Sequence, residues 1–83
     1  MDRFVYAFAK EKGSNPDIGD YVTYAIVGER INGGTKESID KVIIHDVTTK
    51  RTFAERIVSL CERNQVSLVH FKEVIEDLLC VEV

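Results

Sequence analysis

Alternating apolar side chains mark the beginning of the chain. In the run Arg3–Lys10, every second residue from Phe4 to Phe8 is aromatic, and smaller apolar residues lie between them. Successive side chains of a β-strand point to opposite faces, so the aromatic residues share one face and the smaller ones occupy the other. The run therefore predicts a strand that is apolar on both faces.

Two further runs predict strands. Asp20–Ile31 is rich in β-branched and aromatic residues, and Ser38–Val47 is centred on Val42-Ile43-Ile44. The segment Glu11–Gly19, which holds the only proline, has the composition of an exposed loop. Between the second and third strands, Asn32-Gly33-Gly34 favours a tight hairpin, because Asn-Gly readily adopts the positive φ angles of such a turn. These two strands should be antiparallel neighbours.

The hydrophobic period changes after the third predicted strand. From Thr49 to Asn64, apolar residues recur at the three- and four-residue spacing of a helix. Ser67 is a favourable N-cap for a second helix over Leu68–Cys80, which has its own apolar stripe. So short a link predicts an antiparallel helix pair. The residues expected to pack together are Phe53, Ile57 and Leu60 of the first helix and Leu68, Phe71, Ile75 and Leu78 of the second.

Strands followed by helices indicate an α+β fold. We expect a three-stranded antiparallel sheet, wound as a meander, followed by a two-helix antiparallel hairpin that packs on one face. The chain has 83 residues, which is enough for a single domain over residues 1–83. At this size folding buries only about 60–65% of the unfolded chain's surface, so stability should be modest.

Composition narrows the class of protein. Apolar residues make up 45% and the formal net charge is −3, which favours a globular protein and opposes a nucleic-acid binder that relies on many phosphate contacts. No stretch approaches the roughly 18 apolar residues of a membrane span, and the acidic start Met1-Asp2-Arg3 does not resemble a secretory leader. With two cysteines and no CxxC motif, we expect a cytoplasmic protein with reduced thiols.

The polar side of the second predicted helix carries possible metal ligands. His70, Glu73, Asp77 and Cys80 project to one side of it. One straight helix cannot surround an ion with four ligands, so we expect a solvated acidic face that suits a basic protein partner, with no metal and no cofactor. A disulfide between Cys61 and Cys80 is opposed by distance, because an antiparallel pair leaves them about 15 Å apart along the helices.

The start of the first predicted helix is unusually basic. Thr49, Lys50 and Arg51 combine a hydroxyl group, two cations and free backbone N–H groups, which together would suit a phosphate-like anion. The alternative is that both long side chains reach solvent or pair with Asp46 or Glu55.

His45 and Asp46, at the end of the third predicted strand, raise the hypothesis of catalysis. An imidazole beside a carboxylate can act as a base. No nucleophile or glycine-rich phosphate loop accompanies the pair in the sequence. A small ligand-binding or anion-binding domain, or a minor enzyme, that uses this pair and Thr48–Thr52 is therefore the alternative to a non-catalytic protein.

Apolar residues on both faces of the predicted strands exceed what two helices can cover. A sheet has two faces, and two short helices form one layer. We therefore expect the uncovered face or an edge to meet a second copy of the chain, most simply in a two-fold dimer. Aromatic residues concentrate at interfaces, although the sequence does not assign each one to core or interface. The candidate anchors are Tyr6, Phe8, Tyr21 and Tyr24.

Three short motifs resemble a known family. They are Tyr21-Val22-Thr23-Tyr24-Ala25-Ile26, Asp46-Val47-Thr48 and Ser67-x-x-His70-Phe71-x-x-Val74-Ile75-Glu76-Asp77-Leu78-Leu79. In these motifs the chain is similar to a domain-of-unknown-function family of short uncharacterised proteins from clostridia and related Firmicutes. The resemblance implies a bacterial cytoplasmic protein and brings no catalytic residue, cofactor or substrate. We expect a small non-enzymatic interaction module that associates with itself.

Overall fold

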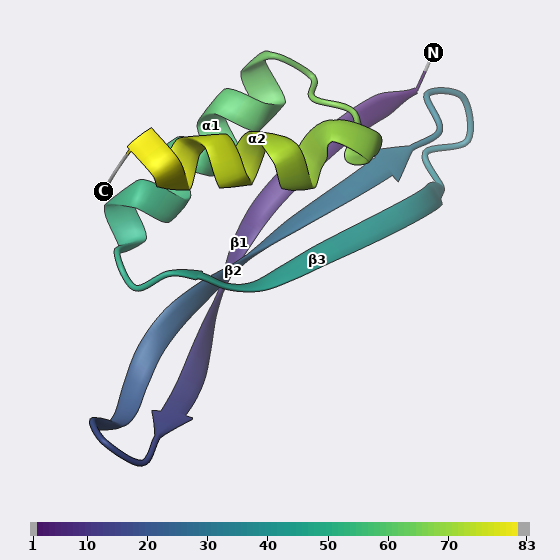
Figure 1. Ribbon diagram of the computed structural model, residues 1–83. Coiled ribbons are helices and arrows are strands. Elements are labelled where there is room, and N and C mark those ends of the chain that lie inside the picture. Colours follow the sequence, from purple (N-terminus) through teal and green to yellow (C-terminus); the bar gives the residue numbers. More distant parts are fainter. Residues whose placement is uncertain (1, 82–83) are drawn as a thin grey trace.

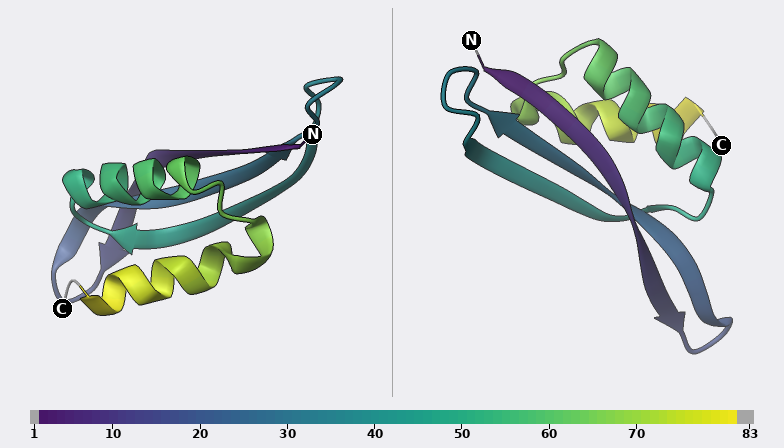
Figure 2. Two further views of the ribbon diagram at one scale, coloured as in Figure 1. Left: turned by 90° about the horizontal axis from the view of Figure 1, so that it is seen from above. Right: turned by 180° about the vertical axis from the view of Figure 1, so that it is seen from behind.

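The computed structural model describes residues 2–81, and the side chains of residues 2–79. The elements are β1 (Arg3–Asn15), β2 (Gly19–Ile31), β3 (Ser38–Thr48), α1 (Arg51–Arg63) and α2 (Leu68–Val81). The strands form one antiparallel sheet in the order β1-β2-β3, and both helices lie on the same side of it (Figures 1 and 2). The structure confirms the α+β fold, a three-stranded meander followed by two helices.

The first hairpin differs from the prediction. β1 continues to Asn15, so the predicted loop over Glu11–Gly19 is wrong for most of its length. The turn itself is short: the N–H of Ile18 donates to the C=O of Asn15 at 3.2 Å, and Gly19 has a φ of 80°. Pro16 is accommodated because a turn position does not have to donate a hydrogen bond to the sheet.

A glycine inside the strand is the reason that the sequence pattern misled. Gly13 lies opposite Tyr21 in the hairpin, and a Cβ atom on Gly13 would come within 2.3 Å of Cζ of that ring. The tyrosine ring therefore lies across the backbone that glycine leaves bare, which is a known way of stabilising glycine in a strand. Gly13 permits this packing and does not mark a turn.

The far halves of β1 and β2 project from the rest of the molecule (Figures 1 and 2). β3 pairs with β2 only from Tyr24 to Ile31, so residues 10–23, which we call the arm, form a ribbon of two strands. This projection makes the molecule 48 Å long, against 25 and 19 Å in the other two directions.

A bulge ends the regular part of β3. Tyr24 of β2 pairs with Thr48 of β3, and Ile26 pairs with Ile44. Between these two pairs, three residues of β3 therefore lie opposite one residue of β2. The middle one, Asp46, has a φ of 53°. The regular edge of β3 therefore stops before the strand itself does.

The core lies between the sheet and the helices. At Gly28 of β2, side chains of the core come very close to the backbone of the sheet. A Cβ atom there would come within 2.8 Å of the side chains of both Leu68 and Tyr6. The rings of Tyr6 and Phe71 are 5.0 Å apart, and the Tyr6 hydroxyl donates to the C=O of Val66. The buried members of the core are Tyr6, Ile26, Val47, Phe53, Ala54, Ile57, Cys61, Phe71 and Ile75.

The predicted helices are confirmed with small shifts. α1 begins at Arg51, two residues later than predicted, and α2 runs back in roughly the opposite direction (Figure 2). Ser67 Oγ accepts the N–H of Val69 at 3.3 Å, as expected of an N-cap. One predicted core residue is wrong: Leu60 lies outside the core, whereas its neighbour Cys61 is fully buried. One residue along a helix is a rotation of about 100°, so two adjacent residues can differ in whether they reach the core.

Phe71→Ala should lower the free energy of unfolding by about 3–5 kcal/mol, because the ring is fully buried and its removal leaves a cavity. The control is Val69→Ala on the same helix. Val69 is 81% exposed, so its replacement should change stability by no more than about 0.5 kcal/mol. Urea unfolding of both variants measures the difference. A cost below about 1 kcal/mol for Phe71→Ala would contradict this packing.

Alkaline pH should destabilise the fold through two buried acids. Burial raises the pKa of the Cys61 thiol from 9.0 to about 11. Burial, and secondly the charge of Cys61, raises the pKa of Tyr6 from 10.0 to about 12. At a pH between the unfolded and the folded pKa of either group, the native state keeps a proton that the unfolded chain releases. The contribution of Cys61 to the free energy of unfolding is therefore complete below pH 9.0. It falls between pH 9.0 and pH 11, by up to about 1.4 kcal/mol per pH unit.

Urea unfolding at several pH values between neutrality and pH 11 measures this decline. Cys61→Ala should make it shallower from pH 9.0 upward, while lowering stability at every pH through the lost side-chain volume. Equal slopes in the two proteins would show that the thiol does not carry the effect.

Candidate functional site

The outer edge of β1 forms hydrogen bonds with Glu62 in the last turn of α1 and with Gln65 in the loop that follows. The N–H of Phe4 donates to Gln65 Oε1 at 3.0 Å, and the N–H of Tyr6 donates to Glu62 Oε1 at 3.1 Å. Gln65 Nε2 also donates to the C=O of Phe4 at 3.1 Å. The side-chain amide of Gln65 thus bonds to both backbone groups of Phe4, as a neighbouring strand would. The start of the β1 edge is closed.

Strand alternation identifies the groups that point outward from β3. The backbone N–H and C=O groups of even-numbered residues of β1 point away from β2, as those of Phe4 and Tyr6 show. The backbone groups of its odd-numbered residues therefore bond to odd-numbered partners in β2. The even-numbered residues of β2 then bond to β3, as in the pair Gly28 and Val42. The backbone N–H and C=O groups of Lys41 and Ile43 therefore point away from the sheet.

These outward groups of β3 are almost free. The N–H of Lys41 donates to the adjacent Asp40 carboxylate at 2.9 Å. The outward backbone groups of Ile43 have no hydrogen-bond partner in the part of the chain that the structure describes. Unpaired groups along an edge strand are a template for another strand.

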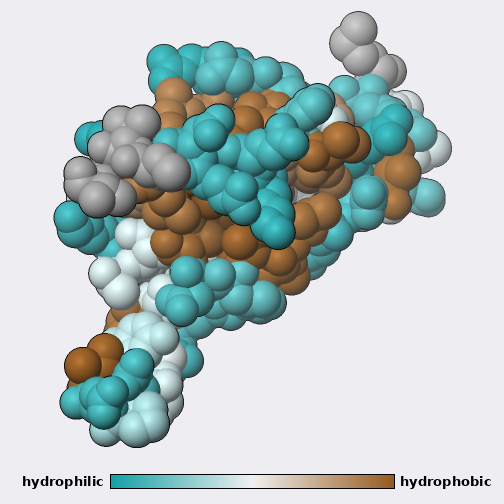
Figure 3. Space-filling model, viewed as in Figure 1, coloured by the Kyte–Doolittle hydropathy of each residue, from teal (hydrophilic) through white to brown (hydrophobic). Residues whose placement is uncertain are grey.

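Apolar side chains accompany this free edge. Ile39 and Ile43 are 49% and 44% exposed, and Val42 and Ile44 are partly buried on the helix side. Figure 3 shows hydrophobic surface between α2 and β3. Edge strands of native proteins are commonly protected by charges, but Lys41 is the one charge in the run from Lys41 to Ile44.

The sheet face opposite the helices is a second exposed surface, which we call the open face. Odd-numbered residues of β1 and β2 point toward it, because the even-numbered core residues Tyr6 and Ile26 point toward the helices. Its small and branched apolar side chains are those of Val5, Ala7, Ala9, Val27 and Ile43.

A hydrogen bond between two side chains crosses the open face. Nδ1 of His45 in β3 lies 2.8 Å from Oε2 of Glu11 in β1. Because β2 lies between these strands, the two side chains meet above it. Thr23 and Ala25 of β2, the strand that this contact crosses, are only 3% and 1% exposed although no helix covers this face.

His45 and Asp46, the predicted catalytic pair, have separate partners. Glu11 orients the imidazole of His45, while Asp46 Oδ1 accepts the hydroxyl of Thr23 at 2.7 Å. That hydroxyl is shielded, and the thiol of Cys61 is fully buried with its pKa raised by burial to about 11. Neither group is exposed, and its raised pKa keeps the Cys61 thiol protonated near neutral pH, whereas a cysteine nucleophile reacts as the thiolate.

One cation of the predicted anion site, Arg51, pairs with a carboxylate of the protein itself. Nε of Arg51 lies 3.1 Å from Glu55 Oε1, and its guanidinium carbon lies 5.9 Å from the centre of the Phe8 ring. Arg51 therefore pairs with Glu55, one of the partners named by the alternative interpretation. Thr49 and Lys50 are exposed beside it, and Lys50 makes no side-chain cap on α1.

The aromatic residues predicted for an interface divide between the two faces. Tyr6 is 3% exposed, so it is corrected from a candidate interface residue to a core residue. Phe8 and Tyr24 pack edge to face on the helix side, 5.8 Å between ring centres, and are partly buried against the core. Tyr21 lies on the arm, across Gly13. The helices cover the strand face that carries the larger side chains.

Among residues 2–79, no three His, Cys, Asp or Glu side chains gather where they could hold a metal ion. His70 and Glu73 approach to 3.7 Å, and the side chain of Cys80, predicted beside them, lies outside the described residues. No helix of the described chain is long and apolar enough to cross a membrane.

Comparison with known families gives one match. A family model covers residues 3–81, and it describes a family of unknown function, DUF6514. The chain belongs to this family. The match confirms the resemblance to a domain of unknown function. Neither the curated proteins nor the solved structures contain a match to the chain.

Two features of this DUF6514 domain have no counterpart in the sequence pattern. One is the closure of the β1 edge by Gln65 and Glu62, and the other is the reach of Glu11 to His45. These contacts join residues 61, 56 and 34 positions apart. Local periodicity identifies Asn64-Gln65 only as the end of a helix.

Gln65→Ala should open the start of β1. We expect a loss of about 1 kcal/mol in stability and a rise of about fivefold or more in the exchange rate of the Phe4 amide proton. The amide of Tyr6, which donates to Glu62, should keep its protection. Hydrogen exchange measured by NMR tests this, with the exposed neighbour Arg63→Ala as the control. Unchanged exchange at Phe4 would contradict the closure.

Proposed function

We propose that this domain is a non-enzymatic interaction module that associates with itself, and that two copies join by pairing their β3 edges. The observation that carries the proposal is the difference between the two edges. Gln65 and Glu62 bond to the start of β1, whereas the backbone of Ile43 has no partner in the described chain. A strand added to a free edge gains main-chain hydrogen bonds and removes an aggregation hazard.

The residues of β3 favour one register of pairing. With the two-fold axis at Ile43, the Ile43 side chains of the two copies lie opposite each other, and Val42 of each copy lies opposite Ile44 of the other. The pairs at the centre are then all apolar, and Lys41 lies opposite His45. An axis at Lys41 would place two ammonium groups face to face, which is unfavourable.

Such a pair forms one sheet of six strands with all four helices on the same side, because the two-fold axis is perpendicular to the sheet. The bulge at Asp46 keeps the pairing short. A contact confined to one short edge falls below the roughly 1,200 Å² of a standard interface, so we expect reversible association of moderate strength.

The proposal includes a cytoplasmic setting and excludes nucleic acid as a partner. Cys61 is a free thiol in the core, and reduced thiols are the rule in the cytoplasm. A formal net charge of −3 opposes binding to a polyphosphate backbone.

Sedimentation from about 1 µM to about 1 mM should show a concentration-dependent monomer–dimer equilibrium. Ile43→Pro removes the N–H at the proposed axis without removing a bond to β2, so it should leave a folded monomer at every concentration. The matched control is Lys12→Pro, whose N–H also points outward, on the arm; it should dimerise like the wild type. Ala7→Glu places a charge on the open face and should also leave association by the edge intact.

Cross-linking tests the register independently of any effect of proline on folding. In a Cys80→Ser background, Ile43→Cys should form a disulfide with its own copy, because residues at such an axis have Cα atoms about 5.5 Å apart, within the range of disulfides. Ile39→Cys, similarly exposed, should not. A wild type that stays monomeric throughout, or an Ile43→Pro variant that still dimerises, would refute the proposal.

A further inference from the structure

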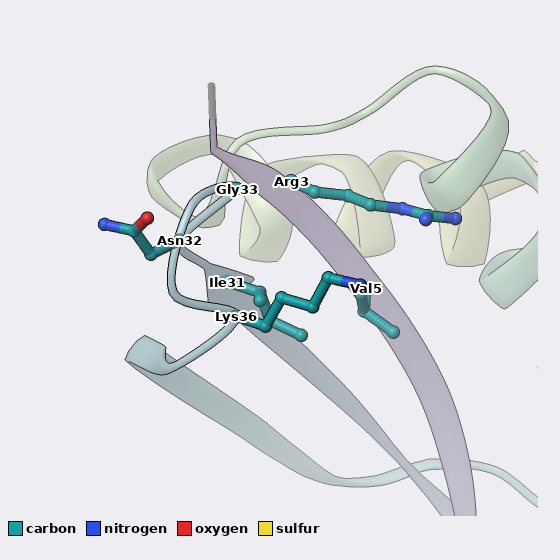
Figure 4. Close-up of a pocket in the computed structure, with 6 residues that line it drawn as sticks. All are labelled: Arg3, Val5, Ile31, Asn32, Gly33 and Lys36. Carbon is teal, nitrogen blue, oxygen red and sulfur yellow. The ribbon is translucent and has the colours of Figure 1, made fainter.

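A cavity of about 380 Å³ lies where the β2–β3 loop meets the open face (Figure 4). This volume is within the range of small-molecule sites. The cavity is at the opposite end of the sheet from the arm, and it lies away from Ile43 and the proposed dimer axis. Its lining residues are Arg3, Val5, Ile31, Asn32, Gly33 and Lys36.

The loop that forms one wall is held by a single asparagine. Asn32 Oδ1 accepts the N–H groups of Gly34 and Thr35, at 2.8 and 3.2 Å. The C=O of Asn32 accepts the N–H of Lys36 at 2.8 Å. Lys36 has a φ of 62°, and its side chain extends from the loop toward Val5 (Figure 4). The loop thereby places an ammonium group over β1.

Among the side chains of residues 2–79, the two cations that line the cavity have no carboxylate partner. Neither Arg3 nor Lys36 makes an ion pair within the described chain, although Glu29 lies opposite Val5 and Glu37 follows Lys36. Arg30 and Arg51, in contrast, pair with Asp2 and Glu55. Two cations from different segments therefore line one cavity, where an anionic group is the complementary ligand.

Val5 and Ile31 give the cavity an apolar wall. Val5 and Ile31 lie on adjacent strands and point to the open face, where Ala7 continues the apolar surface along β1. A ligand that satisfies this cavity needs an anionic head for Arg3 and Lys36 and an apolar tail for the strands. Such a combination of apolar walls and a few polar groups is typical of small-molecule sites.

We propose that this cavity binds a small carboxylic acid with an apolar tail. The carboxylate lies between the guanidinium group of Arg3 and the ammonium group of Lys36, and the tail lies on Val5 and Ile31. The proposal does not depend on pairing of β3, because none of these residues belongs to that strand.

Octanoate is the probe, and its titration is followed by NMR chemical shifts of the backbone amides. We expect saturable shifts at Val5, Ile31 and Lys36. Octylamine and octanol carry the same tail without the anion, and acetate carries the anion without the tail; all three should bind at least about tenfold more weakly. Equal binding of octanol or octylamine overturns the role of the cations, and equal binding of acetate overturns the role of the apolar strands.

The Arg3→Gln, Lys36→Gln double variant should weaken octanoate binding about tenfold, since each exposed ion pair contributes up to about a fivefold effect. The control is Lys12→Gln, which removes the same kind of charge from the arm and should leave the dissociation constant unchanged. An undiminished affinity in the double variant, or shifts confined to another part of the molecule, refutes the site. Sedimentation of the double variant should match that of the wild type, so failure here is distinct from failure of the β3 pairing.

Discussion

The contact of two helices with one face of a two-faced sheet determines the rest of this structure. α1 has 13 residues and α2 has 14, which is enough to cover the strand face that carries Tyr6 and Phe8 and no more. The close approach at Gly28 allows the rings of Tyr6 and Phe71 to fill the space between the layers. The open face is then left exposed to water, and it presents small alanines and the hydrogen-bonded side chains of His45 and Glu11.

The unequal edges follow from the same arrangement. α1 packs most extensively on β1, so residues at its end lie within reach of the β1 backbone, and Gln65 and Glu62 bond to it. α2 packs on the faces of β2 and β3, and its side chains up to Leu79 supply no comparable group to the outside of β3. The start of the β1 edge is closed by the side chains of Gln65 and Glu62, whereas the described part of the β3 edge has apolar residues beside free backbone groups.

Periodic segments could be predicted from the sequence because each is governed by local contacts. The helices, the three strands and the cap at Ser67 all belong to this class. The arm was missed because Gly13 and Pro16 usually mark loops, whereas the ring of Tyr21 makes glycine suitable for a strand. The division of aromatic residues between core and surface depends on which face the helices take, and alternation alone does not contain that information.

The closure of the β1 edge has a consequence for the order in which the chain can fold. Gln65 reaches Phe4 across 61 positions, so this protection requires a loop that closes late compared with the neighbouring strand pairings. The meander comes before both helices in the chain, and during synthesis its strands emerge first. Until α1 docks, both edges of the sheet are free, and the sheet face that carries Tyr6 and Phe8 is exposed to water. The nascent chain is therefore most prone to aggregate in the interval between completing β3 and completing α1.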